Sequence, residues 1–366
     1  MVATNEADEL IGQGDGMVYG AERTRLHSEA VRIVDIHQDV EAGFRARQAL
    51  IESATLGGDP NLALIAFAWC LGQHDANPDR FPVESGGHFT NLLWMYKWIL
   101  ERAAEHPGIS RSKQAELLAD MARRYSERGF SLRPVRKLEM AAAMDMLDDD
   151  QVKVGIAEWL RLRRDSMSDC MACDVDCESA AHLAMRDLPL ARQAAEPLFK
   201  GRMTCAEIPT LTYGRFLLPL SQAGEDAEAT RLAHLLPNRI RTNRDFVMPA
   251  GALVIYHVDH APRQALRTAS RYAAWALSGE TPLRRMPLII GLVRVSRLAR
   301  EMEKGAEPLG MLLPNEPVTS FEEAEQRLTR EARDLADAFD KRNGHNRVGD
   351  AVREHLAGTG QWWWPL

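Results

Sequence analysis

Three of the five cysteines in this chain of 366 residues lie within eight positions, at Cys170, Cys173 and Cys177. A fourth, Cys205, follows one predicted helical hairpin later. Four cysteine thiolates in tetrahedral coordination are a standard structural zinc site. We therefore predict a structural zinc ion bound by Cys170, Cys173, Cys177 and Cys205.

Two other interpretations of these cysteines stay open. A C-x-x-C pair can be a redox motif, but such a motif normally opens a helix after a strand, and no strand is predicted before Cys170. The thiols can also be unrelated buried cysteines, although the stretch DSMSDCMACD is polar and acidic. We expect Asp169 and Asp174 to raise the thiol pKa, which disfavours a nucleophilic cysteine. Zinc is therefore favoured over free thiols and over a redox or regulatory pair.

The elements that position the cysteines are predicted to be repeated helical hairpins. Apolar residues recur at three- and four-residue spacing almost throughout, and alternating β-branched runs are few. An acidic residue precedes an alanine by four positions in GGDPNLA, MRDLPLA and QAGEDAEA, and DDDQVKV and HAPRQA are weaker versions. The anchors Val154, Ala191, Ala229 and Ala265 are separated by 37, 38 and 36 residues. We predict an all-α fold of stacked hairpins, rather than an antiparallel bundle, with equivalent connectors on one face.

Residues 58–63, GDPNLA, resemble the turn and second helix of tetratricopeptide repeats (TPR), although no unit carries the Trp, Leu-Gly and Tyr set of the first helix. DSMSDCMAC, with the later GRMTCAEIPTLTYG, resembles an uncharacterised bacterial group of TPR-like proteins with the pattern D-C-x-A-C and then G-R-x-x-C-A-E-[VI]-P. That resemblance implies a TPR-like α-solenoid and a shared cysteine site, and no activity. The group tends to have His where this chain has Thr210, which leaves Cys177 as fourth ligand, with His182 behind it.

Composition narrows the class of protein. The net charge of −7 argues against a nucleic-acid binder, which usually shows a basic domain or stripe. The longest apolar run, LALIAFAWCLG, is about half of what a bilayer helix requires, and the acidic N-terminus does not resemble a signal peptide. An odd number of cysteines fits a reducing cytoplasm, and the preference for arginine over lysine hints at a GC-rich bacterial genome. We expect a cytoplasmic protein that binds neither nucleic acid nor membrane.

The expected domain organisation is a flexible N-terminal tail over 1–20, a TPR-like α-solenoid over 21–344 with the zinc site in its middle, and a C-terminal helix with a Trp-rich tail over 345–366. A helix opening with the capping box of Ser320 and Glu323 is predicted to close the solenoid. Trp362, Trp363 and Trp364 either fold back on the solenoid or dock into a partner, since tryptophan is favoured at binding hot spots.

The predicted function is a non-catalytic scaffold that binds a protein or peptide segment on the concave face of the solenoid. Candidate groove residues are Tyr96, Tyr125, Arg133 and Arg136. One alternative is a zinc- or thiol-dependent enzyme, which would keep an open metal position with three protein ligands. Another is a peptide-sensing regulator. The sequence contains no G-x-S-x-G and no H-E-x-x-H motif, so two common catalytic signatures are missing.

Overall fold

The computed structural model describes residues 2–57, 59–83, 91–277, 282–302 and 320–361, and these form seventeen α-helices and no strand. The expected all-α fold is therefore confirmed. The helices of the first half are α1 (Val2–Asp15), α2 (Ala21–Ile36), α3 (Val40–Gly57), α4 (Pro60–Ala76), α5 (Leu92–Ala104), α6 (Arg111–Glu127), α7 (Arg133–Asp145) and α8 (Asp149–Arg161). Those of the second half are α9 (Met171–Ala184), α10 (Leu188–Phe199), α11 (Thr210–Gln222), α12 (Asp226–Ile240), α13 (Val247–His260), α14 (Pro262–Tyr272), α15 (Met286–Glu301), α16 (Phe321–Asn343) and α17 (Arg347–Ala357), with short 3-10 turns η2 (Arg244–Phe246) and η3 (Ala273–Trp275).

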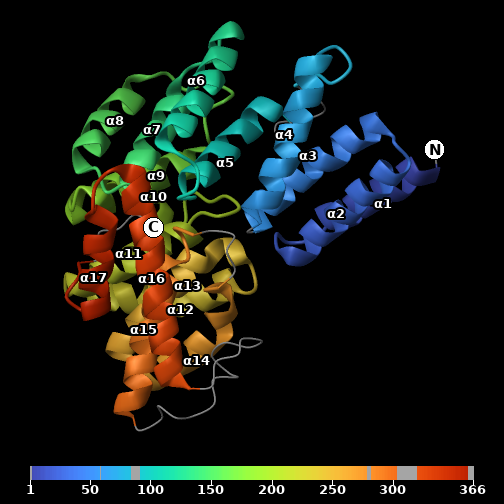
Figure 1. Cartoon of the computed structure of the whole chain (residues 1–366). Helices are drawn as coiled ribbons and strands as arrows, with labels where there is room; N and C mark the ends of the chain where they lie inside the picture. Colours follow the sequence, from blue (N-terminus) through green and yellow to red (C-terminus); the bar gives the residue numbers. More distant parts are fainter. Residues whose placement is uncertain (1, 58, 84–90, 278–281, 303–319, 362–366) are drawn as a thin grey trace.

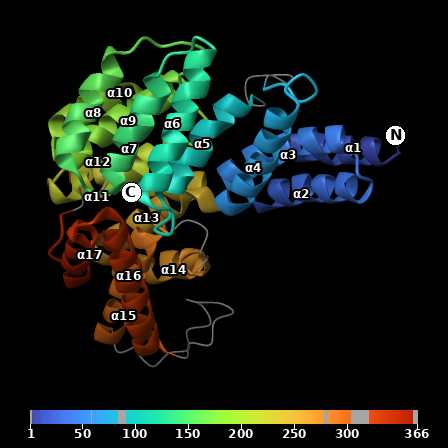
Figure 2. The same cartoon turned by 45° about the horizontal axis from the view of Figure 1, so that its top comes forward.

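Consecutive helices pack in pairs, and the first helices of the pairs also pack on one another. The pairs are α7 with α8, α9 with α10, α11 with α12 and α13 with α14, while α5, α7, α9, α11, α13 and α15 form a continuous row. Figures 1 and 2 show α1–α4 extending to one side of the larger body. The buried apolar side chains form two large clusters, one in the first half of the chain and one through the helices of the second half, and two smaller ones.

The second helix of several pairs begins at a side-chain cap. The caps are Asp59 for α4, Ser110 for α6, Asp148 for α8 and Asp187 for α10, and each side chain accepts a hydrogen bond from the backbone N–H three residues later. Such a cap satisfies one of the N–H groups that the first turn of a helix leaves unpaired. The acidic residue of the sequence pattern therefore caps α4 and α10 as its spacing predicts, whereas Glu225 before α12 makes no side-chain cap hydrogen bond.

One anchor of the predicted repeat is wrong. Val154 is 53% exposed, whereas Val152, four residues after the Asp148 cap, is 1% exposed and faces the core. Val152 thus corresponds to the fully buried Ala191, which follows its cap by the same four residues. With Ala229 and Ala265 the corrected steps become 39, 38 and 36 residues. The sequence pattern aligns Val154 with Asp150, which lies four residues before it. The structure shows that Asp148 is the cap of the helix.

The expected flexible tail over residues 1–20 instead contains helix α1, which packs against α2. Ala7 is buried in a small cluster with Ala30 and Val34 of α2. The carboxylate of Asp15, at the end of α1, lies 3.0 Å from the Arg23 guanidinium. A few apolar positions at helical spacing are enough to form this helix once a partner helix covers them.

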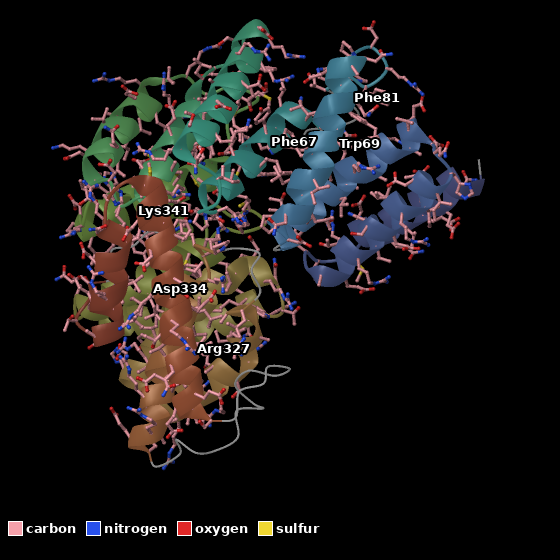
Figure 3. All side chains as sticks on the ribbon, in the orientation of Figure 1. Phe67, Trp69, Phe81, Arg327, Asp334 and Lys341 are labelled. Carbon is pink, nitrogen blue, oxygen red and sulfur yellow. The ribbon has the colours of Figure 1, made fainter. Side chains whose placement is uncertain are left out.

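Helix α16 has the features predicted for a terminal cap of the array. The hydroxyl of Ser320 accepts a hydrogen bond from the N–H of Glu323 at 3.2 Å, and Gly344 ends the helix with a φ of 76°. Figure 3 shows Arg327, Asp334 and Lys341 spaced along α16, and Asp334 and Lys341 are exposed. A polar outer face of this kind is what a solenoid needs at its end for solubility.

A buried group of ion pairs joins parts of the chain that are far apart in sequence. Arg102 of α5 lies 2.8 Å from the Asp245 carboxylate in η2, and Arg284, just before α15, lies 3.3 Å from the same oxygen. Arg284 also contacts Glu105 at 2.6 Å. Asp245 has no exposed surface. Buried charges are tolerated only when they are paired, so this network fixes how α5 meets the C-terminal helices.

Candidate metal centre

Three cysteines converge where the start of α9 meets the connector between α10 and α11. Cys170 is the N-cap of α9, Cys173 lies in its first turn, and Cys205 lies in the connector. Their Sγ atoms are all within 4.8 Å of one another, and those of Cys173 and Cys205 are 3.4 Å apart. Three sulfur ligands at these separations can hold a metal ion, as thiolates do in zinc sites.

Backbone N–H groups point at two of the sulfur atoms. The N–H of Cys173 donates to Cys170 Sγ at 3.4 Å, and the N–H of Ile208 donates to Cys205 Sγ, also at 3.4 Å. The turn at Cys205 is closed by a second bond, from its own N–H to the carbonyl of Ile208 at 2.9 Å. These donors stabilise negative charge on sulfur, so both turns are built to present thiolates.

Cys177 does not belong to this cluster, which corrects the predicted set of four ligands. Its side chain is buried among Met140, Trp159 and Ala180, and desolvation raises the pKa of its thiol to about 12. Since α9 begins at Met171, Cys177 falls in the second turn and packs into the core. The alternative ligand His182 is also outside the cluster, and the Thr210 side chain is buried at the start of α11.

The acidic residues beside the cysteines do not act as predicted, because cations neutralise them. Asp169 lies 2.6 Å from the Lys97 ammonium and 2.7 Å from that of Lys137. Lys137 also donates to the backbone carbonyl of Cys173 at 3.3 Å. The two lysines hold the pKa of Asp169 well below its usual range despite burial.

Asp174 is paired in the same way. Arg133 lies 3.2 Å from its carboxylate, Lys137 lies 3.4 Å away, and Arg164 also contacts it. Around the cysteines, four cationic side chains thus face two carboxylates. Hydrogen bonds from the other two thiols lower the pKa of the Cys170 thiol. The same hydrogen bonds with Cys170 raise the pKa of the Cys173 and Cys205 thiols. Cys170 is therefore the thiol of this cluster that ionises most readily.

A cavity of about 130 Å³ lies beside the cluster, and Cys173 borders both. The first helices α5, α7, α9, α11 and α13 all contribute side chains to its wall. In the part of the chain that the structure describes, no cationic nitrogen lies closer than 3.6 Å to three of its carboxylates, those of Glu101, Asp145 and Glu207. No described residue donates a hydrogen bond to the Asp145 carboxylate. Burial is the main cause that raises its pKa to about 8, and the nearby Glu105 adds to the effect.

The predicted groove residues mostly hold the fold together instead of lining this cavity. The Tyr96 hydroxyl donates to Asp120 at 2.8 Å, and the Tyr125 hydroxyl donates to the Leu93 carbonyl at 2.8 Å; both tyrosines are buried. Arg133 is also buried, and it donates to the carbonyls of Trp159 and Leu162 in addition to its pair with Asp174. Arg136 is half-exposed and pairs with Glu139 of its own helix.

Trp362, Trp363 and Trp364 lie outside the described residues. The chain just before them contacts α11, because the Gln222 amide donates to the Gly360 carbonyl at 3.0 Å.

Sequence reasoning missed Lys97, Lys137 and Asp145, which lie 73, 33 and 25 residues before Cys170. The signal for them was weak. A lysine inside the apolar helix α5 is unusual, and a buried lysine needs an anion.

Known protein families and curated protein sequences were compared with this chain, and none matches it. The resemblance to a bacterial TPR-like group therefore stays a prediction. Among the described residues, no helix combines the length and the apolar character that crossing a bilayer requires.

Proposed function

We propose that this protein is a non-catalytic scaffold that binds a peptide or protein segment on the concave face of a TPR-like solenoid. The observation that supports this most directly is that the first helices of five consecutive units line one cavity. Stacked repeats use equivalent helices to build such binding surfaces. A cavity of about 130 Å³ is close in volume to one of roughly 150 Å³ that accepts benzene, so it suits one side chain of a partner.

A zinc ion bound by Cys170, Cys173 and Cys205 is proposed to cross-link the middle of the array, and this structural zinc site is called the clip below. Soft thiolate ligands in a sulfur-rich site select zinc over the hard cations magnesium and calcium. The ion would tie the start of α9 to the connector before α11, which is otherwise joined to α9 through α10. A reducing cytoplasm keeps such thiols available, so we place the protein there.

The zinc proposal is tested by metal analysis and thiol counting on the full chain. We expect about one zinc per chain after expression with zinc in the medium. Chelation should then expose three reactive thiols, those of Cys170, Cys173 and Cys205, while the buried Cys70 and Cys177 react only after unfolding. Purified protein that carries no zinc, takes none up and shows three reactive thiols from the start would contradict the clip.

The binding proposal is tested by filling the cavity. Ala141 lines the cavity from α7, whereas its neighbour Ala142 does not. Peptides selected from a random displayed library against the wild-type protein should lose at least about tenfold in affinity for Ala141→Phe, about 1.4 kcal/mol. They should bind Ala142→Phe unchanged. Equal binding to both variants, with both folded by circular dichroism, would place the peptide site elsewhere.

A zinc- or thiol-dependent enzyme is the second candidate, because only three ligands converge and catalytic zinc sites keep one position open. An activated zinc-bound water would titrate near neutral pH. If the protein is a scaffold, the zinc-loaded protein should hydrolyse ester and peptide substrates no faster than Cys173→Ser does.

A further inference from the structure

The cysteine cluster provides one ligand fewer than zinc takes in a closed structural site. Structural zinc sites in proteins are almost always four-coordinate. Among the described residues, the three cysteines are the only His, Cys, Asp or Glu side chains that gather at ligand distance. Cys177, the fourth cysteine of this region, is held in the core with Met140 and Trp159. Within the described part of the chain no fourth side chain completes the set, so the fourth position is open to an added ligand.

The charges around the cluster favour an anion in that position. Zinc with three thiolates carries a net charge of −1, and a fourth thiolate would make it −2. The ion-pair group beside the cluster carries a net charge of +2, from Lys97, Lys137, Arg133 and Arg164 against Asp169 and Asp174. Lysines at partly buried positions interact strongly with a nearby negative charge, because the local dielectric is low. The surroundings thus offset the charge of a complete four-thiolate site.

The cluster can be reached by a ligand. Cys170 is exposed, and Cys173 and Cys205 are half-buried. Cys173 also forms part of the cavity wall, so a segment bound in the cavity would end close to the sulfur atoms. Sulfur is the ligand type that best matches a site already made of soft thiolates.

We propose that the zinc-loaded cluster binds an exogenous thiolate as its fourth ligand, from either a small free thiol or the cysteine of a bound peptide. This inference rests on the proposed zinc site. The S–H bond of the incoming thiol breaks, its proton passes to solvent, and its sulfur displaces a water from the metal. No electrons are transferred, so no oxidant is required.

The test uses the full chain loaded with cobalt(II), a coloured substitute for zinc. Probes are 2-mercaptoethanol, a peptide containing one cysteine, and the same peptide with serine in its place. We expect the sulfur-to-cobalt charge-transfer absorbance per cobalt to rise by about one third on thiol binding, as four thiolates replace three. The serine peptide should leave the spectrum unchanged. A response to the peptide at far lower concentration than to 2-mercaptoethanol would identify a peptide cysteine as the ligand; equal responses would identify free thiols.

Variants separate this inference from the zinc proposal. Cys177→Ser should show the same thiol response as the wild type, because Cys177 is not a ligand. Lys137→Gln should weaken thiol binding by about tenfold, since it removes one of the compensating charges, whereas Lys153→Gln, exposed on α8, should not. Failure to bind cobalt or zinc at all would overturn the clip and this inference together. Tight cobalt binding with a spectrum that neither thiol changes would overturn this inference alone.

Discussion

At the scale of single residues, the cysteines divide into ligands and core. Cys170, Cys173 and Cys205 present sulfur to one point, with backbone N–H groups directed at two of them. Cys177 lies one helical turn after Cys173 and is a small apolar side chain in a packed cluster. Free cysteines often behave in this way.

This division predicts the zinc content of two serine variants. Cys173→Ser should lower bound zinc from about one per chain to less than about a tenth, because two thiolates cannot hold the ion at micromolar concentrations. Cys177→Ser should keep full zinc and lose about 1 kcal/mol in the free energy of unfolding, since a hydroxyl replaces a buried thiol. Elemental analysis and urea unfolding measure the two effects. Zinc loss in Cys177→Ser, with Cys173→Ser unaffected, would reverse the assignment.

Asp145 makes stability depend on pH. Its pKa in the folded protein is raised to about 8, whereas an aspartate in an unfolded chain has a pKa of about 4. The folded state therefore holds a proton that the unfolded state releases, so the free energy of unfolding falls as the pH rises from about 4 to about 8. Asp145→Asn removes this loss. We expect the variant to exceed the wild type by about 1–3 kcal/mol at pH 9.

The measurement is urea unfolding at pH 5, 7 and 9, with Asp334→Asn on the exposed face of α16 as control. The advantage of Asp145→Asn should grow with pH, and the control should track the wild type. A constant difference between Asp145→Asn and the wild type at all three pH values would show that the Asp145 carboxyl does not titrate in this range.

At the scale of helices, the second helices of two pairs each begin at a cap and bury a small or β-branched residue four positions later. Asp187 caps α10 and Ala191 follows it in the core; Asp148 caps α8 and Val152 follows it. The small side chain at this position lets the two helices of a pair approach closely, so its burial is a more direct sign of the repeat than the acidic residue.

The corrected register predicts that substitutions at two valines of α8 change the free energy of unfolding by different amounts. Val152→Ala should lower the free energy of unfolding by about 2 kcal/mol, because it leaves a cavity in the core. Val154→Ala, at an exposed position, should change it by less than about 0.5 kcal/mol. Thermal or urea unfolding distinguishes them, and a larger loss for Val154→Ala would restore the register read from the sequence.

At the scale of the whole molecule, charged residues connect the ends of the array. Asp245 lies 143 residues after Arg102 and 39 before Arg284, yet it pairs with both in a fully buried position. Contacts between neighbouring repeats alone would not produce this closure. The network therefore couples α5 to the C-terminal helices. It also borders the cavity, because Glu105 and Arg284 form part of the cavity wall.

Breaking this network is expected to be costly. Asp245→Ala leaves two buried guanidinium groups without their shared carboxylate and should lower the free energy of unfolding by about 3–5 kcal/mol. The control is Glu225→Ala, which breaks an exposed pair with Arg192 and should cost less than about 1 kcal/mol. Chemical unfolding compares them. Similar small losses in both variants would mean that Asp245 contributes little to the closure.

The sequence by itself determined the helical class, the pairing of consecutive helices and the region of the cysteine cluster. These depend on periods of three to four residues and on caps a few positions away, which are local and visible in a linear chain. It also placed Cys205 correctly beside the C-x-x-C pair, because equivalent connectors of a stacked array lie on one face.

Only the tertiary structure decided which cysteines point together, which lysines neutralise Asp169, and how Asp245 closes the array. Each depends on the rotation of a helix about its axis or on contacts between residues that are tens to more than a hundred positions apart. Because α9 begins at Met171, Cys177 lies in its second turn and packs into the core instead of joining the predicted ligand set. Long-range pairs such as Lys97 with Asp169 leave no local pattern, since burial creates the need for a partner only after folding.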